Sequence, residues 1–390
     1  MPVKNRFADM LPEIIRWRHD FHAYPELQFD VHRTAARVAE LLREFGLDEV
    51  TEGIGRTGVV GVIRGRSDSA GRVIALRADM DALPITEATG LPYASTSPGK
   101  MHACGHDGHT SMLLGAAKYL AETRNFDGTA IVIFQPAEEG EAGAREMLED
   151  GLVGRWNIQE FYGLHNMPGL PVGQFAIREG GMMAAADEFE ITVTGKGGHA
   201  AEPQKGIDTM LVAAQIIVAL QSVVSRNVDP LKSGVVSCCV VSSDSTAHNV
   251  LPETVIIRGT ARSLDAGTRE LQANALRRVA ENTAAAFGAQ AVVDYHYGYP
   301  ITVNHAVETG HAVAVAEAIV GPDNVDTNAA PIMAGEDFSF MLETRPGAYI
   351  FLGNGDGAAL HHPKYVFSDE AMPFGASWLA GMIEARMPVA

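Results

Sequence analysis

Residues able to do chemistry gather first in the segment Met101-His-Ala-Cys-Gly-His-Asp-Gly-His109. Three histidines, a cysteine and an aspartate share the eight positions from His102 to His109. Thiolate and imidazole groups are ligands for zinc and related divalent ions. The two glycines allow a tight loop, and helical spacing begins directly after it. The segment therefore predicts a metal site; the alternative interpretation is a polar loop whose cysteine has no function.

Two adjacent carboxylates, Glu138 and Glu139, lie in Phe134-Gln-Pro-Ala-Glu-Glu-Gly140 at the end of a predicted strand. One can bind metal while its neighbour takes a proton from water. Adjacent glutamates are usually solvated surface, so the pair is a weak signal alone. Its place at a strand end strengthens the signal, because α/β sheets bind ligands at that edge.

Further histidines follow later in the chain. His165 comes at the end of another predicted strand, and His361 and His362 stand together near the C-terminus. With Cys104, His106 and one glutamate, His165 and one of the late pair would give five protein ligands. Five ligands suit two closely spaced metals better than one tetrahedral ion.

The elements that must position these groups fall into two patterns. Up to about residue 183, short apolar runs alternate with helical spacing, which predicts a largely parallel sheet with helices on both faces. Helices are expected at 7–23, 31–45, 109–123 and 141–150, and strands at 58–63, 72–78, 129–135 and 159–164. From about 300 onward the alternation returns, so 1–183 and 300–390 are predicted to form one α/β catalytic domain.

The intervening residues 184–299 follow a different order. Glu188–Thr194 alternates polar and apolar residues, as a strand with one solvated face does. A helix at 207–222, strands at 234–243 and 252–261, a helix at 266–286 and a strand at 290–296 complete a βαββαβ series. This order predicts an inserted α+β domain, an antiparallel sheet with helices on one side.

The composition narrows the class of protein. Hydrophobic residues make up 46% of the 390, as in globular proteins, and the formal net charge is -18, so neither nucleic acid nor an anionic membrane is an expected partner. The N-terminus lacks an uninterrupted apolar stretch, and no window holds eighteen consecutive apolar residues. Three cysteines argue against a disulfide framework. We expect a soluble, cytoplasmic protein.

Taken together, the motifs identify a resemblance. The segments MHACGHDGH, FQPAEEG, GLHN, GKGGHAAEP, NVLPETVIIRGTAR, AGEDFSF and LHHPKYVF resemble the metallo-aminoacylase group, which includes hippurate hydrolases, N-acyl-amino-acid amidohydrolases and auxin-conjugate hydrolases. The resemblance begins near Phe21-His-Ala-Tyr-Pro-Glu26 and runs nearly to the C-terminus. It implies a two-metal α/β catalytic domain with an inserted lid and dimerisation domain.

The resemblance also implies roles in the catalytic domain. Cys104 would be shared between two metals and Glu138 would be the general base. The remaining ligands would be His106, Glu139, His165 and His361, with His361 preferred over His362 because the group's motif reads Leu-His-x-Pro. Asp79 and Asp81 would orient the ligands by hydrogen bonds. Related two-metal carboxypeptidases carry a metal-binding His-x-Asp on that strand, where this chain has Arg77, and an arginine cannot bind a cation.

In the inserted domain, His199 would reach the active site of a neighbouring subunit and help to polarise the scissile carbonyl of the substrate bound there. Asn249 and Arg262 would hold the substrate carboxylate, since a guanidinium group offers two parallel hydrogen bonds. Glu336 and Asp337 belong to a motif of the group, but the sequence assigns them no role.

These residues predict a hydrolase that splits N-acyl amino acids into a carboxylic acid and an amino acid, using two divalent metal ions. Zn or Mn is expected, with Ni or Co as alternatives, in a homodimer formed through the inserted domain; pairing of dimers into tetramers stays open. A dipeptidase or carboxypeptidase with the same metal chemistry is the alternative activity. A binding protein that kept the fold without turnover would be expected to lack a ligand or the base, and every motif position is present.

Overall fold

The computed structural model describes residues 5–389, which form two compact units. Unit 1 comprises the chain up to Gly180, Val303–Ala330 and the residues from Asp337 on; unit 2 comprises Gly181–Thr302 and Pro331–Glu336. The sequence placed 331–336 with the catalytic domain, which is wrong by these contacts. The segment joins unit 2 because the backbone N–H of Ala184 donates to the carbonyls of Ile332 and Ala334.

The sheet of unit 1 has eight strands in the order β1-β2-β4-β3-β5-β16-β6-β15. Their bounds are β1 (Glu49–Ile54), β2 (Gly58–Arg64), β3 (Val73–Asp79), β4 (Thr129–Gln135), β5 (Glu160–Met167), β16 (Gly347–Gly353), β6 (Phe175–Ala176) and β15 (Val325–Asp326). The four neighbours β4, β3, β5 and β16 are parallel, whereas β1 and β2 are antiparallel additions. This parallel-rich α/β sheet confirms the predicted fold class, and its parallel strands end at one edge.

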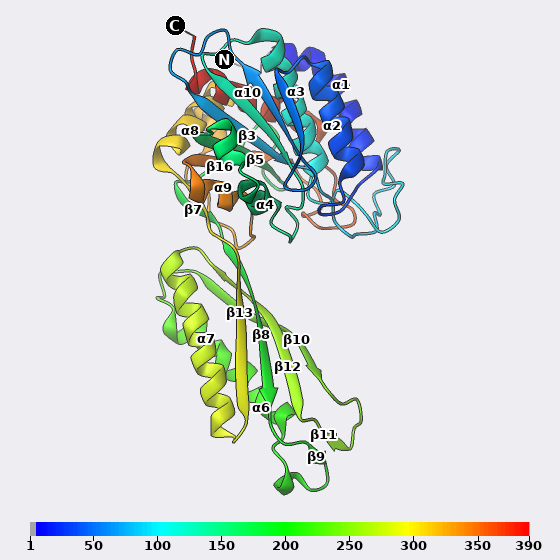
Figure 1. The fold of residues 1–390 in the computed structure, drawn as a ribbon, viewed down its shortest axis with the longest axis vertical. Helices are drawn as coiled ribbons and strands as arrows, with labels where there is room; N and C mark the ends of the chain where they lie inside the picture. The colour runs from blue at the N-terminus through cyan, green and yellow to red at the C-terminus, as the bar shows by residue number, and fades with distance from the viewer. Residues whose placement is uncertain (1–4, 390) are drawn as a thin grey trace. The chain divides into compact units, whose positions relative to one another are not determined.

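Helices cover both faces of this sheet (Figure 1). One layer contains α1 (Asn5–Ala23), α2 (His32–Glu44), α3 (His106–Thr123), α8 (Ala306–Val320) and α10 (Met372–Arg386), in which α3 and α10 contact each other and the sheet. The helices α4 (Gly143–Glu149), α5 (Leu152–Trp156) and α9 (Phe338–Thr344) form the other layer. Helix α3 begins three residues before the predicted start, because Gly105 takes φ 91° and turns the chain directly into it. His106 and His109 therefore lie in the first turn of α3, and His102 precedes the helix.

Unit 2 is a four-stranded antiparallel sheet in the order β10-β12-β8-β13, with two helices on one face. Its elements are β8 (Ala185–Thr194), α6 (Thr209–Ser222), β10 (Gly234–Ser243), β12 (Thr254–Ser263), α7 (Ala266–Ala286) and β13 (Gln290–Tyr299). Alternate residues of β8 and β12, such as Ile191 and Ile257, pack against Ile216 of α6 and Leu276 of α7. The predicted βαββαβ order is therefore present.

By length and composition alone, one helical stretch among residues 5–389, Thr209–Asn227, is apolar enough to cross a membrane. It consists of α6 and a following π-helical turn, Val223–Asn227. This is weak evidence for a membrane, because the buried side chains Val212, Ile216 and Leu220 belong to the core of unit 2.

Candidate active site

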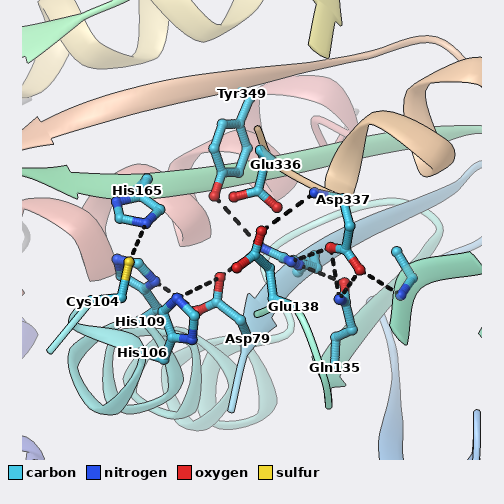
Figure 2. Close-up of polar contacts among 12 residues, drawn as sticks. Asp79, Cys104, His106, His109, Gln135, Glu138, His165, Glu336, Asp337 and Tyr349 are labelled. Carbon is cyan, nitrogen blue, oxygen red and sulfur yellow. Dashed lines mark hydrogen bonds and ion pairs between the residues drawn. The ribbon is translucent and has the colours of Figure 1, made fainter. Parts of the chain in front are cut away.

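The carboxyl edge of the unit 1 sheet gathers the predicted metal ligands. Figure 2 shows three of them, Cys104, His106 and His165, with the predicted base Glu138. Potential ligand atoms of Cys104, His106 and His165 lie within 4.8 Å of one another. Among the further groups that meet the same limit, one consists of Cys104, Glu139 and His361 and another of His106, Glu138 and Glu139. The residues come from the loop before α3, the loops after β4 and β5, and the C-terminal segment. The structure thus brings together the five predicted ligands and the predicted base, while His362 is in none of these groups.

His106 is oriented to present one ring nitrogen to this cluster. Its Nδ1 lies 2.8 Å from the backbone oxygen of Asp81, and since a carbonyl only accepts, Nδ1 carries the proton. Its Nε2 is buried, has no hydrogen-bond partner among the described residues, and lies 3.8 Å from Oδ2 of Asp79. Burial lowers the pKa of His106, but the charges of Asp79 and Asp81 outweigh burial and raise it to about 10. A buried nitrogen facing carboxylates without a partner fits a bound cation.

Cys104 and His165 face each other across the cluster. The Sγ of Cys104 lies 3.4 Å from Nε2 of His165, whose Nδ1 donates to the backbone oxygen of Asn166 at 2.7 Å. Burial holds the pKa of His165 well below its usual value, so its Nε2 lone pair is available. Burial and the nearby Glu139 raise the pKa of the Cys104 thiol. Sulfur, nitrogen and oxygen donors together suit divalent ions of the zinc type, which displace the thiol proton on binding.

His361 reaches the cluster from a strained backbone. Its φ is 63°, and its N–H donates to the carbonyl of Ala103 at 2.8 Å. Its Nε2 lies 3.2 Å from Oε1 of Glu139. Burial raises the pKa of Glu139, but His361 and His106 outweigh this and lower it. A non-glycine residue in the left-handed region costs free energy and is often found at functional sites.

Asp81 holds the glutamate pair in place. Its two carboxylate oxygens accept the backbone N–H groups of Glu138 and Glu139, each at 3.0 Å. Its backbone oxygen also accepts the proton of His106. One buried residue therefore fixes three predicted site residues, in keeping with the predicted orienting role.

His109 belongs to the cysteine–histidine motif, yet its ring nitrogens are both engaged. Nδ1 lies 2.7 Å from Oδ1 of Asp79, and Nε2 accepts the backbone N–H of Asn166 at 3.0 Å. Asn166 also donates from Nδ2 to the carbonyl of Cys104 and accepts from the hydroxyl of Tyr365. His109 therefore links the ends of β3 and β5 instead of facing the cluster. Sequence reasoning missed Asn166 and Tyr365, although Asn166 directly follows His165.

The predicted residues of the inserted domain fall at two ends of unit 2. A short ribbon pairs β9 (Gly198–His199) with β11 (Val250–Leu251), and the N–H of Ala200 donates to the carbonyl of Asn249. His199 and Asn249 are therefore neighbours beside the start of β12. Arg262 is eight residues further along β12, a distance of ~26 Å at the usual rise of a strand. The structure brings His199 and Asn249 together but leaves Arg262 at the opposite end of the sheet.

Comparison with known proteins agrees with these features. Residues 75–385 match the sequence model of Peptidase family M20/M25/M40. The chain is 44% identical to hippurate hydrolase of Campylobacter jejuni (95% of this chain, 96% of the relative). It is 37% identical to thermostable carboxypeptidase 1 of Saccharolobus solfataricus (96% and 95%). Among solved structures, the YXEP protein of Bacillus subtilis, described as a dinuclear metal-binding peptidase from the M20 family, matches with TM-score 0.85 and 35% identity (97% and 99%).

Proposed function

Because the chain belongs to Peptidase family M20/M25/M40 and is a metal-dependent hydrolase of amide bonds, we propose that its substrates are N-acyl amino acids. Hippurate or a similar compound would be split into a carboxylic acid and a free amino acid. The observation that carries this proposal is the ligand cluster, in which Cys104, His106 and His165 are buried and Glu138 lies beside them, in a chain matched almost throughout by a hippurate hydrolase.

The enzyme uses two divalent metal ions, and we propose Zn or Mn, with Ni or Co as alternatives. Cys104 would be shared between them. The other ligands would be His106, Glu139, His165 and His361. When bound, such ions polarise a scissile carbonyl and lower the pKa of a water molecule.

Glu138 is proposed to move the proton. Its side chain is buried and lies with Glu139 and His106 in one group. A carboxylate there accepts the proton of the attacking water and then delivers it to the leaving amine. His199 would donate a hydrogen bond to the oxyanion that forms on the carbonyl carbon.

Recognition of the substrate carboxylate is proposed to involve two chains. Within residues 5–389, the hydrogen bonds of Arg262 use Nη1, to Thr260 and two backbone oxygens. Its Nε and Nη2 edge suits a carboxylate. Within unit 2, Arg262 lies eight residues from the start of β12, ~26 Å at the usual rise of a strand, and Asn249 lies before that start. One carboxylate could therefore contact both residues only if they came from different copies.

A homodimer formed through unit 2 would meet this need. The exposed edge strand β10 and helix α6 carry exposed apolar side chains, namely Met210, Leu211, Val218, Val240 and Val241. Apolar exposure on an unpaired edge is typical of an interface. We propose a cytoplasmic dimer, with tetramers left open; the free thiols of Cys104, Cys238 and Cys239 agree with a reducing compartment.

The test compares hippurate with its neutral amide. Losing a paired, charged hydrogen bond costs about 2–5 kcal/mol, so kcat/KM should fall at least ~30-fold for the amide. Arg262→Ala should erase most of that preference. Arg258→Ala, on the same strand and paired with Glu190, is the matched control and should keep it. Equal cleavage of acid and amide by the wild type would exclude recognition of the carboxylate.

The match to a carboxypeptidase supports a second candidate, cleavage of peptides. Initial rates on hippurate and on an unblocked dipeptide separate the two activities. Faster cleavage of the dipeptide would favour the peptidase.

A further inference from the structure

Arg77 is a fully buried cation at the centre of the unit 1 sheet. It stands on β3 and is 1% exposed. Each arm of its guanidinium group has a different acceptor: Nε donates to Oε1 of Gln135 at 2.8 Å, Nη1 to Oδ2 of Asp79 at 2.7 Å, and Nη2 to Oδ1 of Asp337 at 2.9 Å. One side chain therefore joins two buried carboxylates that belong to distant parts of the chain.

Asp337 carries this connection to the loop of the glutamate pair (Figure 2). Both of its carboxylate oxygens accept Nε2 of Gln135 at 2.8 Å, and Oδ2 accepts the N–H of Ala144 at 2.9 Å. The N–H of Asp337 itself points to Oε1 of Glu138 at 3.4 Å. Asp337 therefore holds the far end of the loop and also faces the carboxylate of the proposed base.

The loop between these anchors, residues 137–143, is strained. Ala137 and Ala142 have φ of 55° and 58°, a region that disfavours residues with a Cβ atom. Asp81 binds the loop near its start through the N–H groups of Glu138 and Glu139. Asp337 binds it at its end. A strained conformation persists only where the surroundings determine it, so these two carboxylates define where the glutamates stand.

We propose that Arg77 and Asp337 are positioning residues for the reaction, and that they set the place of Glu138 relative to the ligand cluster. The inference rests on the proposed function, in which Glu138 moves the proton. On one side Arg77 fixes Asp79, which is bonded to His109 and adjoins His106. On the other it fixes Asp337 and, through it, the glutamate loop. The planar guanidinium group of Arg77 holds the carboxylates of Asp79 and Asp337 at a fixed separation, which the ammonium group of a lysine could not do.

An ion pair that only stabilises the fold and a pair that positions Glu138 would respond differently to the removal of one or both partners. Removing one partner of a buried pair leaves an uncompensated charge, whereas removing both is often nearly neutral for stability. A positioning role is lost in either case. The comparison of Arg77→Gln and Asp337→Asn with the double variant therefore separates stability from positioning.

The experiment measures Tm, metal content per subunit, kcat and KM on hippurate for these three variants. Both single variants should lower Tm and kcat. The double variant should regain part of the lost Tm, since of the two carboxylates only Asp79 remains and it keeps His109 as a partner. It should hold two metal ions, yet keep a kcat at least ~10-fold below wild type, as loss of supporting hydrogen bonds at a site does, with KM within about twofold. Recovery of kcat together with Tm would overturn the proposal, as would a loss expressed only in KM.

Two further variants belong in the same panel. Arg386→Gln breaks another ion pair of unit 1, the partly buried pair with Glu160, and should lower Tm while leaving kcat unchanged; an equal loss of kcat would show that loss of any such ion pair has this effect. Glu138→Gln tests the proposed function itself. If it turns over like wild type, the assignment of the base fails. If it is inactive while the double variant is fully active, the positioning proposal alone fails.

Discussion

Replacement of Asp81 by Asn should separate the glutamate loop from its anchor. Asp81 is 1% exposed, and each carboxylate oxygen accepts one backbone N–H, from Glu138 and from Glu139, at 3.0 Å. Asn keeps one acceptor and turns the other into an NH2 group that faces a donor. A hydrogen bond to a charged group contributes about 1.5–3 kcal/mol, and a buried unsatisfied N–H costs about 1–3 kcal/mol. We expect the metal-free variant to lose about 2–4 kcal/mol of unfolding free energy, since such terms are not additive.

The same change should weaken metal binding, because the carboxylate of Asp81 orients Glu139, whereas its backbone oxygen still accepts the proton of His106. Loss of such a partner typically costs about 10–100-fold in metal affinity. Urea unfolding of the metal-free protein measures the first effect, and competition with a chelator of known affinity measures the second. Asp187→Asn is the matched control: Asp187 is equally buried and accepts the N–H of Gly298 in unit 2, so it should lose stability and keep metal affinity. Unchanged metal affinity in Asp81→Asn would refute the reasoning.

Three further outcomes are expected. Thiol reagents should label Cys104 slowly in the metal-loaded protein and faster after EDTA, because metal binding occupies the sulfur; equal labelling would show that Cys104 is not a ligand. Burial lowers the pKa of His22, but Asp107 and Glu87 outweigh burial and raise the pKa to about 9. The protonated ring therefore stabilises the folded protein fully below about pH 6.5, and this contribution is lost as pH rises through 9. His22→Gln should therefore lower Tm strongly at pH 6 and less at pH 9; a constant difference would contradict the assignment. Mixing Glu138→Gln chains with His199→Ala chains should restore some activity if His199 acts across a dimer, and no recovery in confirmed mixed dimers would place His199 elsewhere.

Local sequence predicted those elements whose pattern is strong. The run Thr129–Gln135 was expected as a strand and forms β4 with the same bounds, because a continuous apolar run between turn signals suits a strand buried on both faces. The strand β1 was missed, since Glu49–Ile54 mixes acidic residues with glycine and is half exposed. The order of the strands in the sheet could not be predicted from the sequence either. The strand β16 lies beside β5 although nearly 180 residues of chain separate their ends, and such pairings depend on contacts that no local pattern records.

The candidate site divides in the same way. Residue type and spacing pointed to Cys104, His106 and the glutamate pair, because few chemistries need those groups together. They could not show that His109 faces Asp79 and Asn166 instead of the cluster. Nor could they give Asp337 a role. In both cases the function of the side chain is set by the acceptor or donor that the fold places opposite it, and these partners come from other strands and loops.

Arg77 on β3 and His106 in the first turn of α3 approach the same carboxylate, that of Asp79. The resemblance implies that two-metal carboxypeptidases outside the aminoacylase group carry a metal-binding histidine at this point of the strand, two residues before an aspartate. Here Nη1 of Arg77 lies 2.7 Å from Oδ2 of Asp79, and Nε2 of His106 lies 3.8 Å from the same oxygen. Burial raises the pKa of Asp79, but His106, His109 and Arg77 outweigh it and keep the carboxyl ionised. Since the guanidinium group cannot bind a cation, the nitrogen ligand has to come from another element. His106, the proposed nitrogen ligand in the first turn of α3, lies next to the same carboxylate, so Arg77 and the Cys-Gly-His segment are two parts of one proposed arrangement.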